Sequence, residues 1–395
     1  MKKTVQDVDL KNKKVFVRCD FNVPVDDDGA ITDDRRIRAA VPTIRYLMEQ
    51  GAAVILASHM GRPKGKPDMK YSLQPVADRL AEILEADVQF VSEPEVVGPQ
   101  TKAAAEALAP GSVMLIENVR FREEETKNEP GFSKELAGLA DLFVNDAFGT
   151  AHRAHCSTVG IADYLPAVSG FLMEKEIRFF GDLLEDPKKP FTAVLGGSKV
   201  ADKIPLIENL LDKVDTILIG GGMAFTFVKA QGNEIGTSLL DSDSLQLSLD
   251  IMEKAKAAGV DFLIPQDVVC AKEFNNDSPA SVHAVTDMPA DEMGLDIGPA
   301  TSEIYRQKIM ESATVVWNGP MGVFEMDNFA AGTKAVAAAM NDSDAVTVIG
   351  GGDSAAAVRK FDMEEGISHI STGGGASLEF LEGKVLPGVA CLDEK

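Results

Sequence analysis

The sequence lacks the segments and the cysteine pattern of a secreted or membrane protein. No apolar run is long enough to span a bilayer, and the two lysines near the start are not followed by the apolar stretch of a secretory signal. Only four cysteines occur in 395 residues, without a CxxC pair: Cys19, Cys156, Cys270 and Cys391. Cysteines this far apart are typical of free thiols in a reducing compartment. We therefore expect a cytoplasmic protein without a membrane partner.

Basic residues are scarce relative to acidic ones. The chain has 39 lysines and arginines against 62 aspartates and glutamates, which gives a formal net charge of −23. Such a chain repels nucleic acid, so we expect no nucleic-acid partner, and any bound anion needs a local basic pocket. Hydrophobic residues make up 45% of the chain, the balance of a folded protein, and the length exceeds what one core usually supports. The composition therefore predicts two globular domains.

The familiar nucleotide and metal motifs are also missing. The sequence contains no GxxxxGK followed by Ser or Thr, and no HRD or DFG, which excludes a Walker-type P-loop and a protein-kinase site. It contains no GxGxxG, which argues against a nicotinamide-dependent dehydrogenase, and no HExxH. His59, His152 and His155 are too scattered to indicate a metal site, and their neighbours Arg62 and Arg153 favour anion binding instead.

What the sequence does contain is an alternation of short β-branched runs and helix-like segments. The runs cover 15–19, 53–58, 88–91, 113–117, 142–145, 192–195, 216–219, 262–264, 314–317, 345–349 and 367–371. The segments rich in Ala, Leu, Glu and Lys cover 35–50, 74–86, 199–211, 244–258 and 332–340. Alternation of this kind predicts an α/β fold in which helices cover a parallel sheet.

We place the boundary between two such domains within 165–190. The segment 171–184 has the composition of a helix and is followed by a polar stretch, 185–190. A surface helix inside one large domain is the alternative, but a single core rarely grows past about 300 residues. We therefore predict two Rossmann-like three-layer domains with parallel sheets, 1–170 and 186–375, separated by a cleft and joined at a hinge by a helix at 171–185.

Polar side chains or glycines follow nearly every predicted strand. In the first half they are Asp20, Phe21 and Asn22, then His59 to Arg62, then Asn118 and Arg120, and then Asp146, His152, Arg153 and His155. In the second half they are glycine-rich stretches at 196–199, 220–222, 318–320, 350–354 and 372–375. Ligands of open α/β sheets bind beyond the carboxyl ends of the strands, so we expect these residues along one edge of each sheet. The alternative, that glycine merely allows a tight turn, explains one or two of these cases.

The arginines are concentrated in the first half. Of the 13 arginines, ten precede residue 154 and none lies between 179 and 305. Arginine holds phosphate or carboxylate with two hydrogen bonds, whereas glycine turns that open into helices present backbone N–H groups to phosphates. The first half therefore indicates a site for a small, doubly anionic molecule, and the second half indicates a site for a nucleotide.

Three residues of the second half are candidates for phosphate and metal binding. Lys199 and Lys203 are four apart after a Gly-Gly turn, and we expect both on one face of a helix near its N-terminus. Asp353 follows three glycines and could hold Mg²⁺ through one carboxylate, with nucleotide phosphates as further ligands. The alternatives are ordinary surface lysines and a carboxylate that caps a helix beginning near Ser354.

The sequence resembles the phosphoglycerate kinase family along essentially its whole length. The resemblance lies in blocks that occur in order: RCDFNVP (18–24), ITDDRRIRAAVPTI (31–44), SHMGRP (58–63), LIENVRF (115–121), NDAFGTAHRAH (145–155), LGGSKVADKI (195–204), IGGGMAFTF (219–227), MGLDIGP (293–299), WNGPMGVFE (317–325), GGGDSAAAV (350–358) and STGGGASLEFLEGK (371–384). It implies a glycolytic and gluconeogenic enzyme that reversibly transfers a phosphoryl group between 1,3-bisphosphoglycerate with ADP and 3-phosphoglycerate with ATP, with Mg²⁺. It further implies a monomer with a first domain for phosphoglycerate, which the C-terminal tail from about 376 rejoins, and a second domain for nucleotide.

The resemblance also assigns roles to individual residues. Phosphoglycerate would contact Asp20, Phe21, Asn22, Arg36, His59, Met60, Gly61, Arg62, Arg120 and Arg153. ADP or ATP would contact Lys199, Lys203, Gly220, Gly221, Gly222, Gly294, Asn318, Glu325, Gly351, Gly352, Asp353 and Ser354, with Asp353 on the magnesium side. Catalysis would rest on Arg36, Lys199 and the backbone at Gly374, brought together from the two domains. Met60 and Ser354 differ from residues often found in the family, and neither change removes a needed functional group.

Two other functions remain open on the sequence. A nicotinamide-dependent dehydrogenase would also use paired α/β domains, although its glycine fingerprint is missing. A non-catalytic protein that closes on an anionic metabolite would need the arginine site but not the second set of glycine turns.

Overall fold

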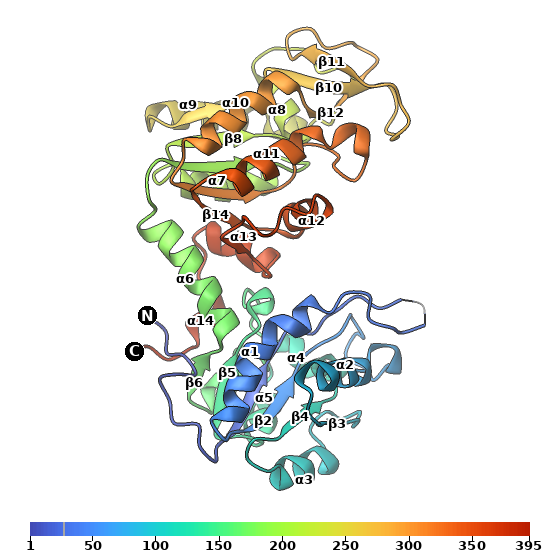
Figure 1. The fold of residues 1–395 in the computed structure, drawn as a ribbon, viewed down its shortest axis with the longest axis vertical. Helices are drawn as coiled ribbons and strands as arrows, with labels where there is room; N and C mark the ends of the chain where they lie inside the picture. The colour runs from blue at the N-terminus through green and yellow to red at the C-terminus, as the bar shows by residue number, and fades with distance from the viewer. Residues whose placement is uncertain (27) are drawn as a thin grey trace. The chain divides into compact units, whose positions relative to one another are not determined.

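The computed structural model describes residues 1–26 and 28–395. Within these ranges the chain forms two compact units, one of Met1–Arg178 with Val385–Lys395 and one of Phe179–Lys384 (Figure 1). No helix within the described ranges is both long and apolar enough to cross a membrane.

The first unit is built on a six-stranded parallel sheet in the order β3-β4-β2-β1-β5-β6. Its strands are β1 (Lys14–Arg18), β2 (Ala53–Ala57), β3 (Val88–Val91), β4 (Val113–Ile116), β5 (Leu142–Asn145) and β6 (Ala167–Ser169). Its helices are α1 (Arg35–Glu49), α2 (Gln74–Leu84), α3 (Pro99–Ala107), α4 (Glu123–Lys127), α5 (Pro130–Ala137) and, from the C-terminal segment, α14 (Pro387–Ala390). The connections leave β1 and β5 in opposite directions along the sheet, so the switch point, where such sheets bind ligands, lies between these two strands.

Burial explains why these segments form these elements. The inner strands β2 and β4 are buried at every position, as expected for parallel strands covered on both faces. Helix α1 buries Ile37, Ile44 and Leu47, which recur at helical spacing and pack in the same core as β1 and β2.

The second unit repeats this plan and adds a small sheet. Its six parallel strands run in the order β15-β14-β13-β7-β8-β9, with a switch point between β7 and β13. They are β7 (Phe191–Leu195), β8 (Thr216–Ile219), β9 (Asp261–Leu263), β13 (Thr314–Asn318), β14 (Val346–Ile349) and β15 (His369–Ile370). The helices are α7 (Ile204–Leu210), α8 (Met223–Ala230), α9 (Leu245–Ala257), α10 (Pro299–Met310), α11 (Ala331–Asp342), α12 (Gly352–Lys360) and α13 (Gly375–Leu381). The predicted parallel-sheet α/β fold is thus confirmed in both units.

Helix α6 (Phe171–Glu185) covers the segment predicted as the connecting helix, and the division between the units falls within it. Its first turn is fixed by the buried Asp146, whose Oδ1 accepts the backbone N–H groups of Leu172 at 2.9 Å and Met173 at 3.1 Å. A carboxylate is favourable there because the N–H groups of the first helical turn have no partner within the helix.

The C-terminal segment rejoins the first unit from Val385 onward. Gly388 N–H donates to Ala151 O, and Asp393 N–H donates to Ala167 O, both at 2.8 Å. This start is later than the predicted 376, because α13 packs on α7 and Leu381 O accepts the Asn209 side chain at 2.7 Å within the second unit.

Two features differ from the pattern expected from the sequence. An antiparallel sheet of β10 (Asp267–Ala271), β11 (Ser281–Ala284) and β12 (Met293–Ile297) was not foreseen, since β11 has no buried position and β12 contains Gly294 and Asp296, which interrupt the apolar run expected of a buried strand. The helix expected over 199–211 begins only at Ile204, and a 3₁₀ turn, Ala201–Lys203, precedes it. Pro205 has no N–H to give to an earlier carbonyl, so it belongs in a first helical turn.

Candidate substrate and nucleotide sites

The predicted anion-binding residues of the first unit follow four neighbouring parallel strands. Asp20 to Asn22 follow β1, His59 to Arg62 follow β2, and Arg120 lies in a 3₁₀ turn, Val119–Phe121, after β4. Arg153 lies beyond β5. Hydrogen bonds tie the first three loops together, because Gly61 N–H donates to Asn22 Oδ1 at 2.8 Å and Arg120 Nη1 donates to Gly61 O at 2.9 Å. This geometry is consistent with the prediction that these loops meet at one edge of the sheet.

Arg36 approaches the same loops from the first turn of α1. Its Nη1 lies 2.9 Å from Asp20 Oδ2 and 3.3 Å from Asn22 O, and the side chain is partly exposed. Arg62 is exposed, and its guanidinium makes no ion pair or hydrogen bond within 1–26 and 28–395. Arg153 is also exposed and donates from Nε to His152 Nε2 at 3.1 Å. Two guanidinium groups at this edge are therefore accessible to an anion.

The site concentrates positive charge and keeps its histidines neutral. Burial, together with the charges of Arg18 and Arg153, lowers the pKa of Arg120 to about 10, which leaves it protonated at neutral pH. Burial lowers the pKa of His155 to about 4 and that of His59 well below its ordinary value, and neighbouring arginines act in the same direction. An anionic ligand would relieve this repulsion among like charges.

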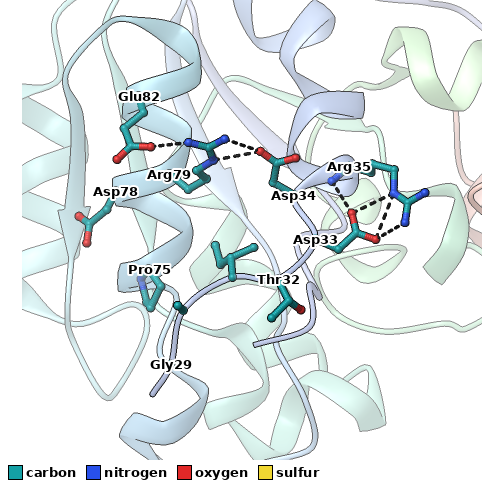
Figure 2. Close-up of a pocket in the computed structure, with 11 residues that line it drawn as sticks. Gly29, Thr32, Asp33, Asp34, Arg35, Pro75, Asp78, Arg79 and Glu82 are labelled. Carbon is teal, nitrogen blue, oxygen red and sulfur yellow. Dashed lines mark hydrogen bonds and ion pairs between the residues drawn. The ribbon is translucent and has the colours of Figure 1, made fainter. Parts of the chain in front are cut away.

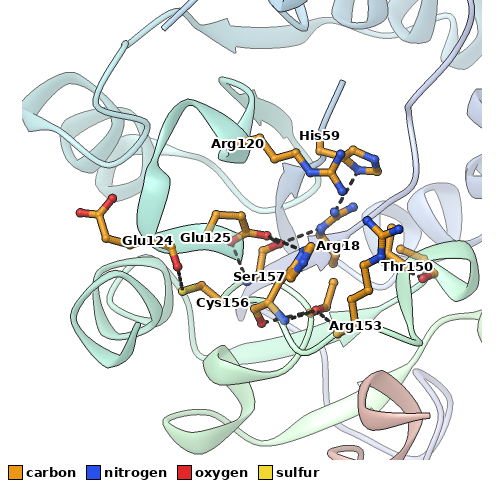
Figure 3. A network of polar contacts seen from close by, with 12 residues as sticks. Arg18, His59, Arg120, Glu124, Glu125, Thr150, Arg153, Cys156 and Ser157 are labelled. Carbon is orange, nitrogen blue, oxygen red and sulfur yellow. Dashed lines mark hydrogen bonds and ion pairs between the residues drawn. The ribbon is translucent and has the colours of Figure 1, made fainter. Parts of the chain in front are cut away.

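Sequence reasoning missed the buried side chains beneath the site. Glu125, Ser157 and Arg18 are fully buried and form a chain of hydrogen bonds that ends at His59 (Figure 3). One signal was available, since Arg18 is a charged residue inside a run of apolar strand residues and must find a partner when buried. Glu125, in a run of three glutamates, gave no such signal.

A second hollow in the first unit is lined by ion-paired side chains (Figure 2). It has a volume of about 650 Å³ and lies between 29–35 and the helix α2. Its two arginines are paired with carboxylates: Arg79 lies 2.8 Å from Asp34 and 2.5 Å from Glu82, and Arg35 lies 2.6 Å from Asp33. Four carboxylates line the hollow against these two arginines, so negative charge remains in excess. None of the predicted site residues lines it, so it is a poor candidate for the anion site.

The second unit contains a pocket of about 610 Å³. Five predicted nucleotide-binding residues line it: Gly221, Gly222, Gly294, Glu325 and Asp353. The remaining ones do not line it: Lys199, Lys203, Gly220, Asn318, Gly351, Gly352 and Ser354. The pocket is lined by residues that follow β7, β8 and β13 and by β12 along its length, so it lies beside the switch point between β7 and β13.

The glycine turns at this edge are packed backbone against backbone. A Cβ on Gly196 would lie 2.1 Å from Pro320 O, and a Cβ on Gly221 would lie 2.6 Å from Gly197 N. Gly221 also has φ +67°, a conformation that favours glycine. Close packing of turns thus accounts for these glycines, and the same turns form one wall of the pocket.

Apolar side chains form the other wall, and sequence reasoning did not identify them. Phe225, Leu239, Leu240 and Phe274 line the pocket, and the last three are among the exposed large hydrophobic residues. Exposed apolar side chains around a concave surface are suited to the flat face of a base. Their positions outside the strand ends gave no sign of this role.

The two lysines occupy different environments, contrary to the prediction of a shared helical face. Lys203 ends the 3₁₀ turn and hydrogen-bonds through Nζ to Asn318 Oδ1, and burial lowers its pKa. Lys199 lies before that turn, is exposed, and its ammonium group contacts no hydrogen-bond or ion-pair partner in the described part of the chain. Asn318 is fixed in turn, because its Nδ2 donates to Gly350 O at 2.8 Å.

Asp353 lies in the first turn of α12, after Gly351, whose φ of +99° favours glycine. It is exposed and lines the pocket, and it does not cap the helix, since the capping position is Gly351. Ser354 accepts the Gly319 N–H at 2.7 Å and is buried, so its hydroxyl serves the turn. The described residues contain no cluster of three or more potential metal ligands. An exposed carboxylate at the pocket, such as that of Asp353, suits Mg²⁺ that arrives with nucleotide phosphates.

The predicted catalytic residues are divided between the units. Arg36 belongs to the first unit, and Lys199 and Gly374 belong to the second. Gly374 immediately precedes α13 with φ +53°.

Comparisons with known proteins agree with this geometry. The model of the phosphoglycerate kinase family matches residues 5–384. A phosphoglycerate kinase of Clostridium botulinum (strain Alaska E43 / Type E3) is 58% identical over 394 residues, covering 100% of this chain and 99% of its own, and that of Clostridium tetani is 56% identical over 395 residues, covering 100% and 98%. The solved phosphoglycerate kinase of Coxiella burnetii has 43% identity and a TM-score of 0.91 over 99% of this chain and 98% of its own, and that of Pyrococcus horikoshii has 35% identity and a TM-score of 0.81 over the same shares. The chain therefore belongs to the phosphoglycerate kinase family of enzymes.

Proposed function

We propose that this enzyme transfers a phosphoryl group reversibly between 1,3-bisphosphoglycerate and ADP, giving 3-phosphoglycerate and ATP. The observation that carries the proposal is that the two units offer two different kinds of binding site. One unit gathers arginines at its sheet edge, and the other offers a pocket with glycine turns on one side and apolar side chains on the other. Family membership supports the same pair of substrates.

In this proposal the arginine site binds phosphoglycerate. The accessible guanidinium groups of Arg62 and Arg153 are free to hold the phosphate and carboxylate oxygens in pairs. Asp20 and Asn22 carry oxygens suited to the substrate hydroxyl. Arg36 exchanges part of its contact with Asp20 for the ligand, since its pairing at 2.9 Å is partly exposed.

The pocket of the second unit binds the nucleotide. Phe225, Leu240 and Phe274 pack against the base. Gly221 and Gly222 have no side chains, so the backbone of their turn can come close to the nucleotide. Magnesium bound through Asp353 would neutralise phosphate charge and orient the nucleotide.

The chemistry needs no general base. The acceptor carboxylate of 3-phosphoglycerate is ionised at neutral pH, so no proton has to be removed from it. Catalysis then consists of in-line positioning and of neutralising charge on the transferring group. Lys199 and Arg36 supply the positive charge for this, and the N–H groups around Gly374 supply hydrogen-bond donors. We also propose a monomer that acts in the cytoplasm; the four free cysteines are compatible with a reducing compartment.

A coupled assay tests the proposal. Purified protein is mixed with ADP and 1,3-bisphosphoglycerate, and ATP formation is followed with and without Mg²⁺. We expect turnover that needs both substrates and the metal. Binding of 3-phosphoglycerate without any ATP formation would instead support the non-catalytic alternative. Oxidation of a candidate substrate with NAD would support the dehydrogenase.

A further inference from the structure

A buried chain of hydrogen bonds, which we call the Glu125 relay (Glu125, Ser157, Arg18 and His59), lies beneath the arginine site (Figure 3). Glu125 accepts from the Ser157 hydroxyl at 2.6 Å and from the Ser157 N–H at 3.0 Å. Ser157 Oγ accepts from Arg18 Nε at 2.8 Å, and Arg18 Nη2 lies 3.1 Å from His59 Nδ1. The relay thus joins a buried carboxylate to a histidine of the predicted site.

Burial makes the relay a set of interdependent contacts. Glu125, Ser157 and Arg18 have 0% exposure and His59 has 4%. A charged guanidinium in such a place is costly unless an opposite charge and hydrogen bonds compensate it. Burial raises the pKa of the Glu125 carboxyl, and the charge of Arg18 opposes that rise, so the two groups stabilise each other's ionised forms.

The donors and acceptors of the relay have a single consistent direction. A guanidinium has only donors, so Arg18 Nη2 donates and His59 Nδ1 accepts. An imidazolium would turn Nδ1 into a second donor facing Arg18, which is unfavourable. The other charged or titratable groups around His59 are Arg36, Arg120 and His155, and none of them favours a positive ring. In the neutral ring the hydrogen is therefore on Nε2, which makes no hydrogen bond with the described residues.

We propose that Glu125, Ser157 and Arg18 are positioning residues that hold His59 as the Nε2–H tautomer, so that His59 offers a neutral N–H donor to an anionic oxygen of the substrate. The inference rests on the proposed function for the identity of that substrate, but the tautomer itself is a property of the free protein. Glu125 orients the Ser157 hydroxyl, this hydroxyl and Cys19 O hold the Arg18 guanidinium, and Arg18 fixes the ring nitrogen that is left for the ligand.

The tautomer is measured directly by long-range ¹H–¹⁵N correlation spectra of the histidine rings in the full-length protein. The His59 signals are identified by their loss in His59→Gln. We expect a protonated Nε2 and an unprotonated Nδ1 at pH 7, unchanged on acidification to about pH 5. A ring protonated on Nδ1 in the wild-type protein would overturn the proposal, and this measurement needs no folded relay variant.

The relay is tested by Ser157→Ala, which removes the hydroxyl between Glu125 and Arg18. We expect a mixture of His59 tautomers and a KM for 3-phosphoglycerate raised about fivefold to tenfold, with kcat and the KM for ATP within about twofold. The control is Ser248→Ala in α9, which removes an equally buried hydroxyl. That hydroxyl donates to Ser244 O at 2.8 Å. This control should match the wild-type protein in all these values.

Glu125→Gln provides a second variant that keeps the side-chain shape but removes the charge. An unchanged His59 tautomer in both Ser157→Ala and Glu125→Gln would overturn the positioning role. Failure of the proposed function is distinguishable, because a protein without ATP turnover could still show the Nε2–H tautomer and its loss in Ser157→Ala. ATP turnover by a protein whose His59 ring is protonated on Nδ1 would refute the proposed role of the relay and leave the proposed function intact.

Discussion

Gly294 in β12 is the pocket position at which a single methyl group should do most harm. A Cβ at Gly294 would lie 2.0 Å from Phe225 Cζ and 2.4 Å from Cε1. Phe225 is 3% exposed and packs in a cluster with Val228, Ile235 and Val268, so the ring can shift only against these neighbours or toward the pocket that it lines. Because φ at Gly294 is not in the left-handed region, the effect of Gly294→Ala should be steric and not due to backbone strain.

The size of the effect follows from the packing. Forcing an additional carbon into a filled core costs about 1–3 kcal/mol, through shifted side chains and backbone. Gly294 and Phe225 both line the proposed nucleotide pocket, so the displaced ring or strand changes the shape of that pocket. A loss of about 1.4 kcal/mol in binding corresponds to tenfold in affinity. We therefore expect Gly294→Ala to raise the Kd for ADP about tenfold and to lower the free energy of unfolding by about 1–3 kcal/mol.

Isothermal titration with ADP and with 3-phosphoglycerate, together with urea unfolding, measures these quantities. Affinity for 3-phosphoglycerate should not change, because its proposed residues lie in the other unit. The control is Gly131→Ala in α5, where no atom lies within 4 Å of the added carbon and alanine is the better helix former. Wild-type affinity for ADP and wild-type stability in Gly294→Ala would refute the steric reasoning.

Four further outcomes are expected. Lys199→Ala should lower kcat at least a hundredfold with less than tenfold loss of ADP affinity, and equal losses in steady-state and titration data would contradict a transition-state role. Arg62→Ala should raise the KM for 3-phosphoglycerate about tenfold or more, and an unchanged value would remove this residue from the site. EDTA should abolish turnover, and Asp353→Asn should raise the Mg²⁺ concentration needed for half-maximal rate; turnover without divalent metal would disprove both expectations. Burial raises the pKa of Asp296 from 3.8 to about 7, so the folded state holds a proton that the unfolded state has lost, and the free energy of unfolding should fall by roughly 1.4 kcal/mol per pH unit between those values. Asp296→Asn should remove that contribution, and identical pH slopes in urea unfolding would count against it.

The candidate site residues that the sequence predicted are those whose location follows from the strand that precedes them in the chain. Asp20, His59 and Arg120 each come soon after a buried strand, and parallel strands present their carboxyl ends at one edge, so their convergence is a consequence of the strand pattern. The apolar wall of the proposed nucleotide pocket was not identified. Phe225 lies in α8 and packs against Val268 of β10, and Phe274 lies in the loop after β10.

The helix predicted at 199–211 shows that composition alone does not fix where a helix begins. The segment contains good helix formers, but Pro205 delays the start of the regular helix to Ile204. Lys199 therefore lies in the loop and Lys203 in the 3₁₀ turn, and their environments differ in burial and partners.

The order of the residues alone determined the class of this fold, the connecting helix and the strand ends that carry the candidate site residues, because burial on both faces of a parallel sheet and helical periodicity are local patterns. Only the tertiary structure decided which side chains are buried beneath the arginines and which surround the pocket. Arg18 contacts Ser157 from the segment after β5 and His59 from the loop after β2, and Ser157 in turn contacts Glu125 of α4. Contacts between segments so far apart in the chain depend on the packing of the whole unit. The direction of a hydrogen bond and the ionisation of a buried group follow from those contacts, which no local pattern contains.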